Sequence, residues 1–357
     1  MRQGLKLSCL WVLRALGIFA LARYLTRGGL MIVGWHGVSI EDEHLRFPSL
    51  FISRESFRRR LRFLVDHYRV IDLPEAVRQL EEGRLQPNLV VLTFDDGFYN
   101  FYSQAAPILR EFQLPATLYA VSDSIDNNRP NLGLMTRDLI LRSTQASIES
   151  PIPGDAGGVS LATPADRERF TKRCLDALKL LNPDEKVSLV RTLAERLGVD
   201  MDRLLGARIW HTVNADEMRE LSAEGFCIQL HTHTHLNVVD YAAELEDELS
   251  QNRSTIERVT CKDASHFCYP SGCWERRSWD QLRKSGVVSA TTTRQGPNFL
   301  KTPLLALRRV LNGENRSQLE FEFEMSNLRW LLWAVLHPRY YAMPTERVKF
   351  KQATGAY

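Results

Sequence analysis

The chain has 357 residues, of which 44% are apolar, 25% charged and 9% aromatic, and these proportions exclude a collagen, a disordered tail and a multi-span membrane protein. Its 46 basic and 43 acidic side chains give a net charge of +3, too balanced for a dedicated nucleic-acid binder, so we expect no nucleic-acid partner. The six cysteines show no CxxC pair and no regular spacing, which indicates reduced thiols in a chain of this length.

The first 29 residues are basic and contain no acid, and Arg14 splits their apolar stretch Leu7–Ala22 into halves too short to span a bilayer. Three interpretations stay open: a basic amphipathic helix on an anionic membrane surface, a first helix packed on the fold, or a cleaved signal peptide, against which Arg14 argues. The apolar segment Trp330–Leu336 has the first two interpretations as well. Two apolar ends favour peripheral membrane binding. Together with the reduced thiols, they predict a cytoplasmic chain on the inner membrane surface, with an exported form as the alternative.

Short apolar runs alternate with helical patterns along the rest of the chain. Helices are expected between the runs: Ser53 is placed to cap one, Asn214 with Glu217 forms a capping box for another, and a further helix is expected over 241–259. This alternation implies an α/β fold with a parallel sheet and crossover helices. The seven expected strands are residues 30–35, 89–94, 116–121, 226–230, 266–269, 287–292 and 307–311.

Residues 126–208 break this alternation. They contain a Pro/Gly-rich loop at 151–158 between helical patterns near 134–147, 164–181 and 184–197, and we interpret them as a helical insertion. The expected organisation is therefore an N-terminal helix over 1–29, a domain over 30–316 that contains the insertion, and a C-terminal extension over 317–357.

Two adjacent carboxylates, Asp95 and Asp96, follow the expected strand 89–94 and precede Gly97. In a parallel α/β fold, functional sites form at the carboxyl ends of strands. Adjacent carboxylates repel one another unless a positive charge lies near them. A metal ion would supply that charge, with one Asp as its ligand and the other free as a base. The alternative is a turn in which Asp and Gly serve only the backbone.

Three histidines, His231, His233 and His235, follow the expected strand 226–230. One helical turn would place His231 and His235 on the same face, which is a metal-ligand spacing. His233 points elsewhere in that geometry and is interpreted as a solvated or supporting histidine. Two His and one Asp leave positions open on a divalent ion, most suitably Zn²⁺, with Co²⁺, Ni²⁺ or Fe²⁺ also compatible, which is typical of a catalytic site.

Two further strand ends carry possible chemistry. The strand 266–269 is followed by Pro270-Ser271-Gly272, a turn that can aim a backbone N–H into a pocket, as oxyanion holes require. His36 follows the first strand, where a histidine suits a general acid. A simple turn and a buried core histidine are the respective alternatives.

Together these residues resemble the polysaccharide deacetylases of carbohydrate esterase family 4, the nodulation-protein-B homology domain. Residues 93–97 look like that family's first motif, 231–235 like its second and 267–272 like its third, in the same order. Trp35-His36-Gly37-Val38 resembles the aromatic-His-x-Val signature of the branch similar to poly-N-acetylglucosamine deacetylases. The resemblance implies a distorted (β/α)7 barrel, in agreement with the alternation of strands and helices.

The resemblance also implies a role for each matching residue. Asp95 would be the general base that deprotonates the attacking water, His36 would protonate the leaving amine, and the backbone N–H of Ser271 would stabilise the oxyanion. The substrate would be an N-acetylated amino sugar in a bacterial surface polysaccharide or a lipid-linked glycan. The metal ligands would be Asp96, His231 and His235.

Two departures from the family pattern affect these roles. Many members have, where this chain has Cys268, an Arg that orients the base; Arg309 in the last strand is our first candidate to replace it and Arg294 the second. The His that other branches use as acid near the C-terminus is absent, and Leu311-Asn312 occupies that neighbourhood. The acid role therefore depends on His36.

Two other functions stay open. The same metal site could serve an O-deacetylase or another amide hydrolase, and a barrel without turnover could bind glycans. The base and all three metal ligands are present, which favours an enzyme, a hydrolase of carbon–nitrogen bonds other than peptide bonds.

Overall fold

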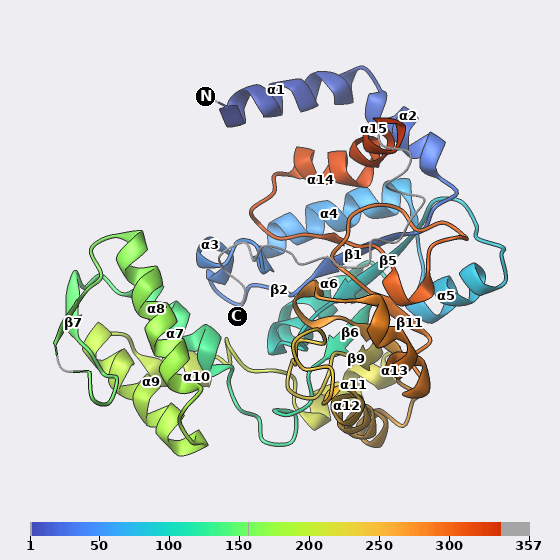
Figure 1. Ribbon diagram of the computed structural model, residues 1–357. Helices are drawn as coiled ribbons and strands as arrows, with labels where there is room; N and C mark the ends of the chain where they lie inside the picture. The colour runs from blue at the N-terminus through green and yellow to red at the C-terminus, as the bar shows by residue number, and fades with distance from the viewer. Residues whose placement is uncertain (1, 156, 337–357) are drawn as a thin grey trace. The chain divides into compact units, whose positions relative to one another are not determined.

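The computed structural model describes residues 2–155 and 157–336, and it divides the chain into two compact units. The first comprises residues 2–127 and 213–336, and the second comprises Asn128–Thr212 (Figure 1). The second unit corresponds to the insertion expected at 126–208, with boundaries slightly further along the chain. Residues 337–357, the end of the expected C-terminal extension, lie outside the described residues.

A parallel sheet forms the centre of the first unit. Its strand order is β11-β10-β9-β6-β5-β1-β12, and each pairing along this path is parallel. A short strand, β4 (Arg69–Val70), pairs with the start of β5. The strands of the path are β1 (Met31–Trp35), β5 (Leu89–Phe94), β6 (Thr117–Ala120), β9 (Cys227–Leu230), β10 (His266–Cys268), β11 (Ser289–Thr291) and β12 (Val310–Leu311).

The two edges of this sheet meet through one segment of the chain. β12 pairs with β1, while Leu307, just before β12, forms a parallel bridge with Thr291 of β11. The N–H of Leu307 donates to the carbonyl of Ala290, and the N–H of Thr292 donates to the carbonyl of Leu307, each at 2.8 Å. This closure makes the sheet a distorted barrel, so the predicted α/β barrel is confirmed.

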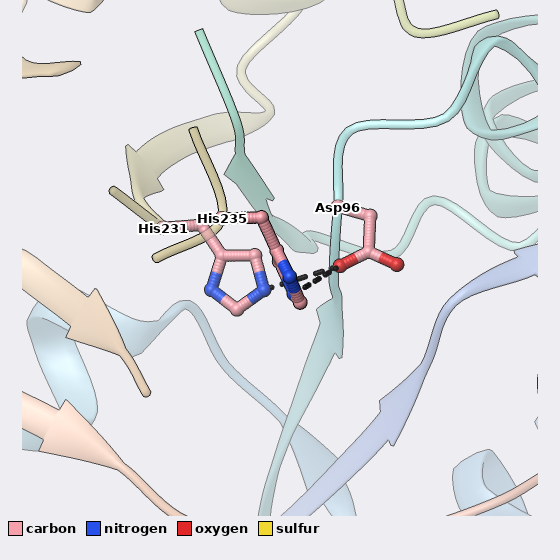
Figure 2. Close-up of side chains that lie close together, drawn as sticks. All are labelled: Asp96, His231 and His235. Carbon is pink, nitrogen blue, oxygen red and sulfur yellow. Dashed lines mark hydrogen bonds and ion pairs between the residues drawn. The ribbon is translucent and has the colours of Figure 1, made fainter. Parts of the chain in front are cut away.

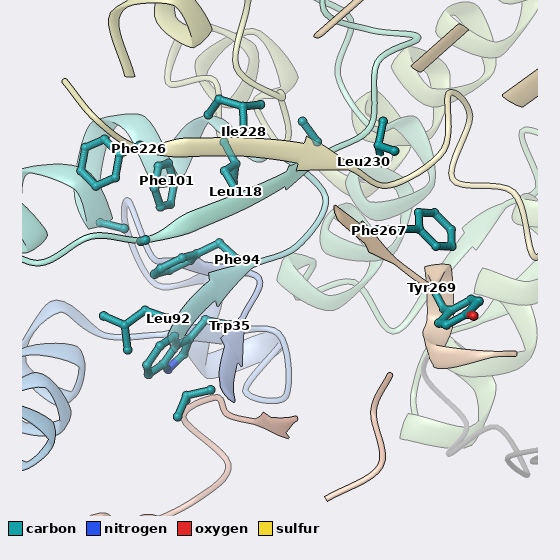
Figure 3. Packing of buried hydrophobic residues seen from close by; sticks show 14 of the residues in the cluster. Trp35, Leu92, Phe94, Phe101, Leu118, Phe226, Ile228, Leu230, Phe267 and Tyr269 are labelled. Carbon is teal, nitrogen blue, oxygen red and sulfur yellow. The ribbon is translucent and has the colours of Figure 1, made fainter. Parts of the chain in front are cut away.

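Aromatic side chains fix the register of the central strands. Trp35 and Phe94 stack with ring centroids 5.5 Å apart (Figure 3), and Phe57 of α4 (Arg54–His67) meets Trp35 edge-on at 5.3 Å. Side chains of this size contribute on the order of 1.5–3 kcal/mol each when buried. Because strand residues alternate between two faces, this packing also fixes which residues emerge at the strand ends.

Helices surround the barrel, and two of them begin at predicted caps. The Ser53 hydroxyl accepts a main-chain N–H at the start of α4, and Asn214 and Glu217 form the capping box of α11. Helix α12 (Leu245–Thr260) begins later than expected, because the Asn237 side chain accepts two main-chain N–H groups and holds the preceding residues in turns. The other helices and strands of this unit, apart from the two terminal pairs, are β2 (Gly37–Val38), α3 (Glu43–Arg46), β3 (Phe51–Ile52), α5 (Leu73–Glu81), a π-helix (Phe101–Ala105), α6 (Ala106–Glu111), α11 (Ala215–Ala223), α13 (Trp279–Lys284) and 3-10 turns at Pro270–Gly272, Arg276–Ser278 and Leu304–Ala306.

The second unit is mainly helical, as expected, but it also contains a β-hairpin. β7 (Ser147–Glu149) and β8 (Gly158–Ser160) pair antiparallel on either side of the Pro/Gly-rich segment. These strands have three residues each, too few for a recognisable alternation in the sequence. The helices of this unit are α7 (Leu132–Arg142), α8 (Pro164–Leu178), α9 (Pro183–Leu197) and α10 (Met201–Gly206).

The N-terminal segment forms two helices instead of the single one expected over 1–29. α1 (Arg2–Ala15) and α2 (Ile18–Thr26) meet at a bend of 70°, where Gly17 adopts φ 74°, a left-handed backbone that favours glycine. No single helix in the described part of the chain is long and apolar enough to cross a membrane, whereas this bent pair passes by length and composition only.

Both N-terminal helices pack on the domain. α1 lies along α14 (Gln318–Met325), and α2 lies against α15 (Leu328–Leu336), as Figure 1 shows. The second of the three interpretations, a packed helix, therefore describes their inner face. That face contributes to a buried cluster formed by Leu10, Phe19, Ala22 and Leu328.

Candidate active site

Asp95 and Asp96 lie at the carboxyl end of β5, which is buried along its whole length between β1 and β6. The N–H of Asp95 donates to the carbonyl of Trp35 at 2.9 Å. Asp96 adopts φ 68° and Gly97 φ 74°, and a Cβ at Gly97 would lie only 3.2 Å from the Cα of Ala120. This left-handed turn directs the adjacent carboxylates to different partners.

Asp96 meets the two outer histidines of the segment that follows β9. Its Oδ1 lies 3.2 Å from Nε2 of His231 and 3.4 Å from Nε2 of His235 (Figure 2). The ligand atoms of these three residues all lie within 4.8 Å of one another. The structure therefore brings together the three residues predicted to hold a metal.

The expected local conformation of the two histidines is wrong. Residues 231–235 form no helical turn; instead Thr232 (φ 63°) and His235 (φ 62°) have left-handed backbones. The resulting tight loop brings the rings of His231 and His235 within 5.0 Å, between centroids. A left-handed residue other than glycine is strained and needs support from its surroundings.

The hydrogen bonding of His231 shows that the cluster fits a cation. Its Nδ1 lies 2.8 Å from the carbonyl oxygen of Cys268, which can only accept, so Nδ1 carries a proton. A neutral imidazole then presents the Nε2 lone pair to the Asp96 carboxylate, and a cation between them would satisfy both acceptors. When no ion lies between them, the ring N–H groups of His231 and His235 face Asp96 and hold its pKa well below its ordinary value, although burial alone would raise that pKa. Two His and one ionised Asp form a zinc-type donor set with open positions.

Helix α12 supports the histidine loop. The fully buried Asn252 accepts the N–H of His231 through Oδ1, and its Nδ2 donates to the carbonyl of Ala120, both at 2.9 Å. One turn earlier, Glu248 accepts the main-chain N–H and the hydroxyl of Thr234, both at 2.8 Å. Sequence reasoning missed both supporting residues. The available signal was two polar side chains, four residues apart, among the buried leucines of an amphipathic helix.

His233 ties the same loop to the end of β6. Its Nδ1 lies 2.9 Å from the hydroxyl oxygen of Ser122, and its carbonyl accepts the N–H groups of Ser122 and Asp123. Of the two interpretations offered for His233, the supporting one describes its contacts.

Asp95 forms a buried, two-point ion pair with Arg309. Nη1 donates to Oδ1 at 2.7 Å and Nη2 donates to Oδ2 at 2.8 Å, and 1% of the Arg309 side chain is exposed. Nε of Arg309 donates to the carbonyl of Thr292, and Nη2 lies 3.1 Å from Sγ of Cys268. Burial alone would raise the pKa of Asp95, but the Arg309 guanidinium holds it below its ordinary value. Of the two arginines considered, Arg309 is the one that the structure joins to Asp95 through two hydrogen bonds.

His36 lies at the same end of the barrel as the two carboxylates. It follows β1, whose last residue, Trp35, pairs with Phe94 immediately before Asp95. Its partly exposed imidazole interacts electrostatically with both Asp95 and Asp96. The position is compatible with a general acid, a role that stays a prediction.

Ser271 lies in the exposed turn after β10 and adopts φ 57°. Among the residues that the structure describes, no hydrogen bond joins Ser271 to the Asp96–His231–His235 cluster. The contact from this motif comes instead from Cys268, whose carbonyl binds His231. The oxyanion role of Ser271 stays a prediction.

The parallel barrel thus belongs to the α/β class and gathers these residues at the carboxyl ends of its strands, where functional sites form in such folds. The model of the polysaccharide deacetylase family matches residues 82–148 and 164–290, more than half of the chain. The chain therefore belongs to the polysaccharide deacetylase family, as the motifs predicted.

Two curated relatives match a shorter region. The poly-beta-1,6-N-acetyl-D-glucosamine N-deacetylase of Escherichia coli K12 is 34% identical over 101 residues, which are 28% of this chain and 15% of that protein. The Staphylococcus epidermidis protein of the same name is 26% identical over 123 residues, 31% of this chain and 43% of that protein. The matched region thus spans less than half of either relative.

Solved structures share the fold over most of the chain. The Streptococcus pyogenes deacetylase PplD, in complex with acetate, has a TM-score of 0.55 at 16% identity and covers 83% of this chain and 98% of its own. IcaB from Ammonifex degensii has a TM-score of 0.52 at 16% identity, with 84% and 97% covered.

Proposed function

We propose that this chain is a metal-dependent N-deacetylase that hydrolyses the N-acetyl group of an amino sugar in a surface polysaccharide or lipid-linked glycan. The observation that carries the proposal is the pairing of two separately held carboxylates. Asp95 is ionised and bound by Arg309, while its neighbour Asp96 faces the two histidines. The activity named for the Escherichia coli and Staphylococcus epidermidis relatives supports an N-acetylglucosamine polymer as the substrate class.

Asp96, His231 and His235 would hold a divalent ion, Zn²⁺ or another ion compatible with this donor set, such as Co²⁺, Ni²⁺ or Fe²⁺. Such an ion polarises a carbonyl oxygen and makes water more acidic. The Cys268 carbonyl orients His231, and Asn252 and Glu248 orient the loop that carries both histidines.

The remaining residues would move protons during hydrolysis. The Asp95 carboxylate takes a proton from the water that attacks the acetyl carbonyl carbon, and Arg309 fixes the orientation of that carboxylate. His36 gives a proton to the nitrogen as the C–N bond breaks, so that acetate and a free amine leave. The Ser271 N–H is the candidate donor to the oxyanion.

We also propose that this hydrolysis takes place in the cytoplasm. The structure describes all six cysteines, and each of them is a free thiol. Six cysteines without a disulfide are typical of a protein in a reducing compartment, which supports this proposal.

Acetate release by the purified protein tests the proposed function. The substrates are N-acetylglucosamine oligosaccharides and extracted lipid-linked glycan, each assayed with and without a chelator and after return of zinc or cobalt. We expect release that the chelator abolishes and the metal restores. An O-acetylated oligosaccharide assayed in parallel separates N- from O-deacetylation. An alkoxide leaving group depends less on a proton from His36 than an amine does.

A protein that binds one zinc per chain but releases no acetate from any of these substrates would contradict the proposal. Such a protein would instead be a barrel that binds glycans without turnover.

A further inference from the structure

The outer face of α1 is an exposed apolar stripe. Leu5, Cys9, Val12 and Leu16 recur at the spacing of one helical face, and all four are exposed. The exposed fractions of Leu5, Val12 and Leu16 run from 51% at Val12 to 76% at Leu5. Trp11, which lies next to this stripe in sequence, is also exposed.

Exposed apolar side chains also occur on the two neighbouring helices. On α2, Leu21, Tyr24 and Leu25 are exposed, again at helical spacing, and α15 adds Leu332 and Leu336. α2 contacts both α1 and α15. We refer to the exposed apolar side chains of α1, α2 and α15, together with Leu16 after α1, as the outer apolar face.

This face is exposed although the helices themselves are docked. Leu10 and Phe19 are buried on the inner side, and two ion pairs hold α1 to α14, from Lys6 to Glu320 and from Arg14 to Glu322 (2.7 Å). The outward direction of the apolar side chains is therefore part of the folded arrangement and does not result from a detached helix.

The concentration of these side chains is unusual for a protein surface. Single exposed leucines, such as Leu45 and Leu180, occur elsewhere on the chain and need no explanation. Many large apolar residues exposed on helices that contact one another indicate an interaction site.

The charges around the face favour a lipid surface as its occupant. Residues 1–29 contain Arg2, Lys6, Arg14, Arg23 and Arg27 and no acid. The nearest acids, Glu320 and Glu322 of α14, are paired with Lys6 and Arg14. The exposed Arg27 lies 4.2 Å from the ring centroid of Tyr24. Aromatic and basic side chains beside an apolar face are typical of helices at an anionic membrane interface.

We propose that the outer apolar face of α1, α2 and α15 docks the domain on the surface of an anionic lipid leaflet. The helices lie in the interface and do not cross it, because crossing would break the two ion pairs to α14 and expose the buried cluster that includes Leu10. The carboxylate–histidine site is not required for this docking, so the inference does not depend on the proposed reaction.

Co-sedimentation of the full chain with vesicles tests the docking. The vesicles contain phosphatidylglycerol and phosphatidylethanolamine, or phosphatidylcholine alone, at low and high salt. We expect binding to the anionic vesicles, weakened by salt and by replacement with phosphatidylcholine. The triple variant Leu5→Glu/Val12→Glu/Leu16→Glu should lower the partition coefficient by at least about a hundredfold, since three apolar contacts are lost and three like charges are added.

The matched control is Leu45→Glu/Leu180→Glu, which adds charge at exposed leucines outside the outer apolar face and should bind as the wild type does. Metal content and acetate release, measured in detergent-free solution, show that the triple variant is folded and separate a docking defect from a defect in the site. Wild-type protein that stays off anionic vesicles, or a triple variant that binds them equally well, would overturn the inference. So would light scattering that shows a dimer which the triple variant dissociates, because a second copy would then cover the face.

Discussion

Arg309 binds Asp95 although the two residues are 214 positions apart in the sequence. Its Nη1 donates to Oδ1 of Asp95 at 2.7 Å, and its Nη2 donates to Oδ2 at 2.8 Å. The same guanidinium touches Sγ of Cys268, the position at which many family members have an arginine. An arginine just before β12 thus takes the place of the arginine that the family resemblance implies on an earlier strand. The orientation of the proposed base is kept, although the residue that provides it has moved.

Removal of Arg309 should destabilise the fold through Asp95. Arg309→Met leaves a buried carboxylate without a partner and should lower the free energy of unfolding by about 3–5 kcal/mol. In the double variant Arg309→Met/Asp95→Asn the free energy of unfolding should fall by less than the sum of the two single decreases, because the second substitution removes the unpaired charge. Urea unfolding of the four proteins measures this coupling. Arg84→Met, which removes an exposed ion pair with Glu82, is the control because such pairs contribute little to stability. An equal decrease in the free energy of unfolding in Arg84→Met and Arg309→Met would contradict the assignment.

Asn252 should control metal affinity without touching the metal. Asn252→Ala removes the acceptor of the His231 N–H and frees the strained loop, and loss of such support typically lowers affinity about 10–100-fold. Competition with a chromophoric chelator measures the zinc dissociation constant directly. Ser250→Ala, on the exposed side of the same helix, should leave that constant unchanged. An unchanged zinc dissociation constant in Asn252→Ala would show that the histidine loop keeps its conformation without Asn252.

His266 should make the fold sensitive to acid. Burial lowers the pKa of this side chain from 6.5 to about 4, while the unfolded chain takes up its proton near 6.5. The unfolded state therefore binds more protons in this window, and stability falls as pH drops from about 6.5 to 4, with no effect above it. Between pH 7.5 and 4.5 the wild type should lose about 2 kcal/mol more than His266→Gln. Urea titrations at the two pH values measure the difference.

A His266→Gln variant with the same pH slope as the wild type would show that His266 does not titrate with folding.

The sequence indicated that Asp96 and His231 would lie near one another because each lies within two residues of the end of a strand. Asp96 follows β5 and His231 follows β9, and the carboxyl ends of parallel strands meet at one end of a barrel. The fold was predictable for the same reason, since its strands read as continuous apolar runs between amphipathic helices.

The conformation of the histidine loop could not be predicted in this way. Spacing alone suggested a helical turn. The left-handed backbones of Thr232 and His235 depend instead on main-chain N–H groups of this loop that donate to Asn252 and Glu248, which are distant in sequence. Likewise, sequence offered two candidates for the partner of Asp95, and only barrel closure selects Arg309. Local patterns therefore identified the side chains that meet at this end of the barrel, while long-range contacts set their orientation.

The most direct test compares zinc content and acetate release in Asp95→Asn and Asp96→Asn. These residues are neighbours in sequence, and both are buried, but they have different partners. We expect Asp95→Asn to keep one zinc per chain and to lose at least about a hundredfold in acetate release, while Asp96→Asn loses both metal and activity. Wild-type turnover in Asp95→Asn, or full zinc and full turnover in Asp96→Asn, would contradict the division of roles between the two carboxylates.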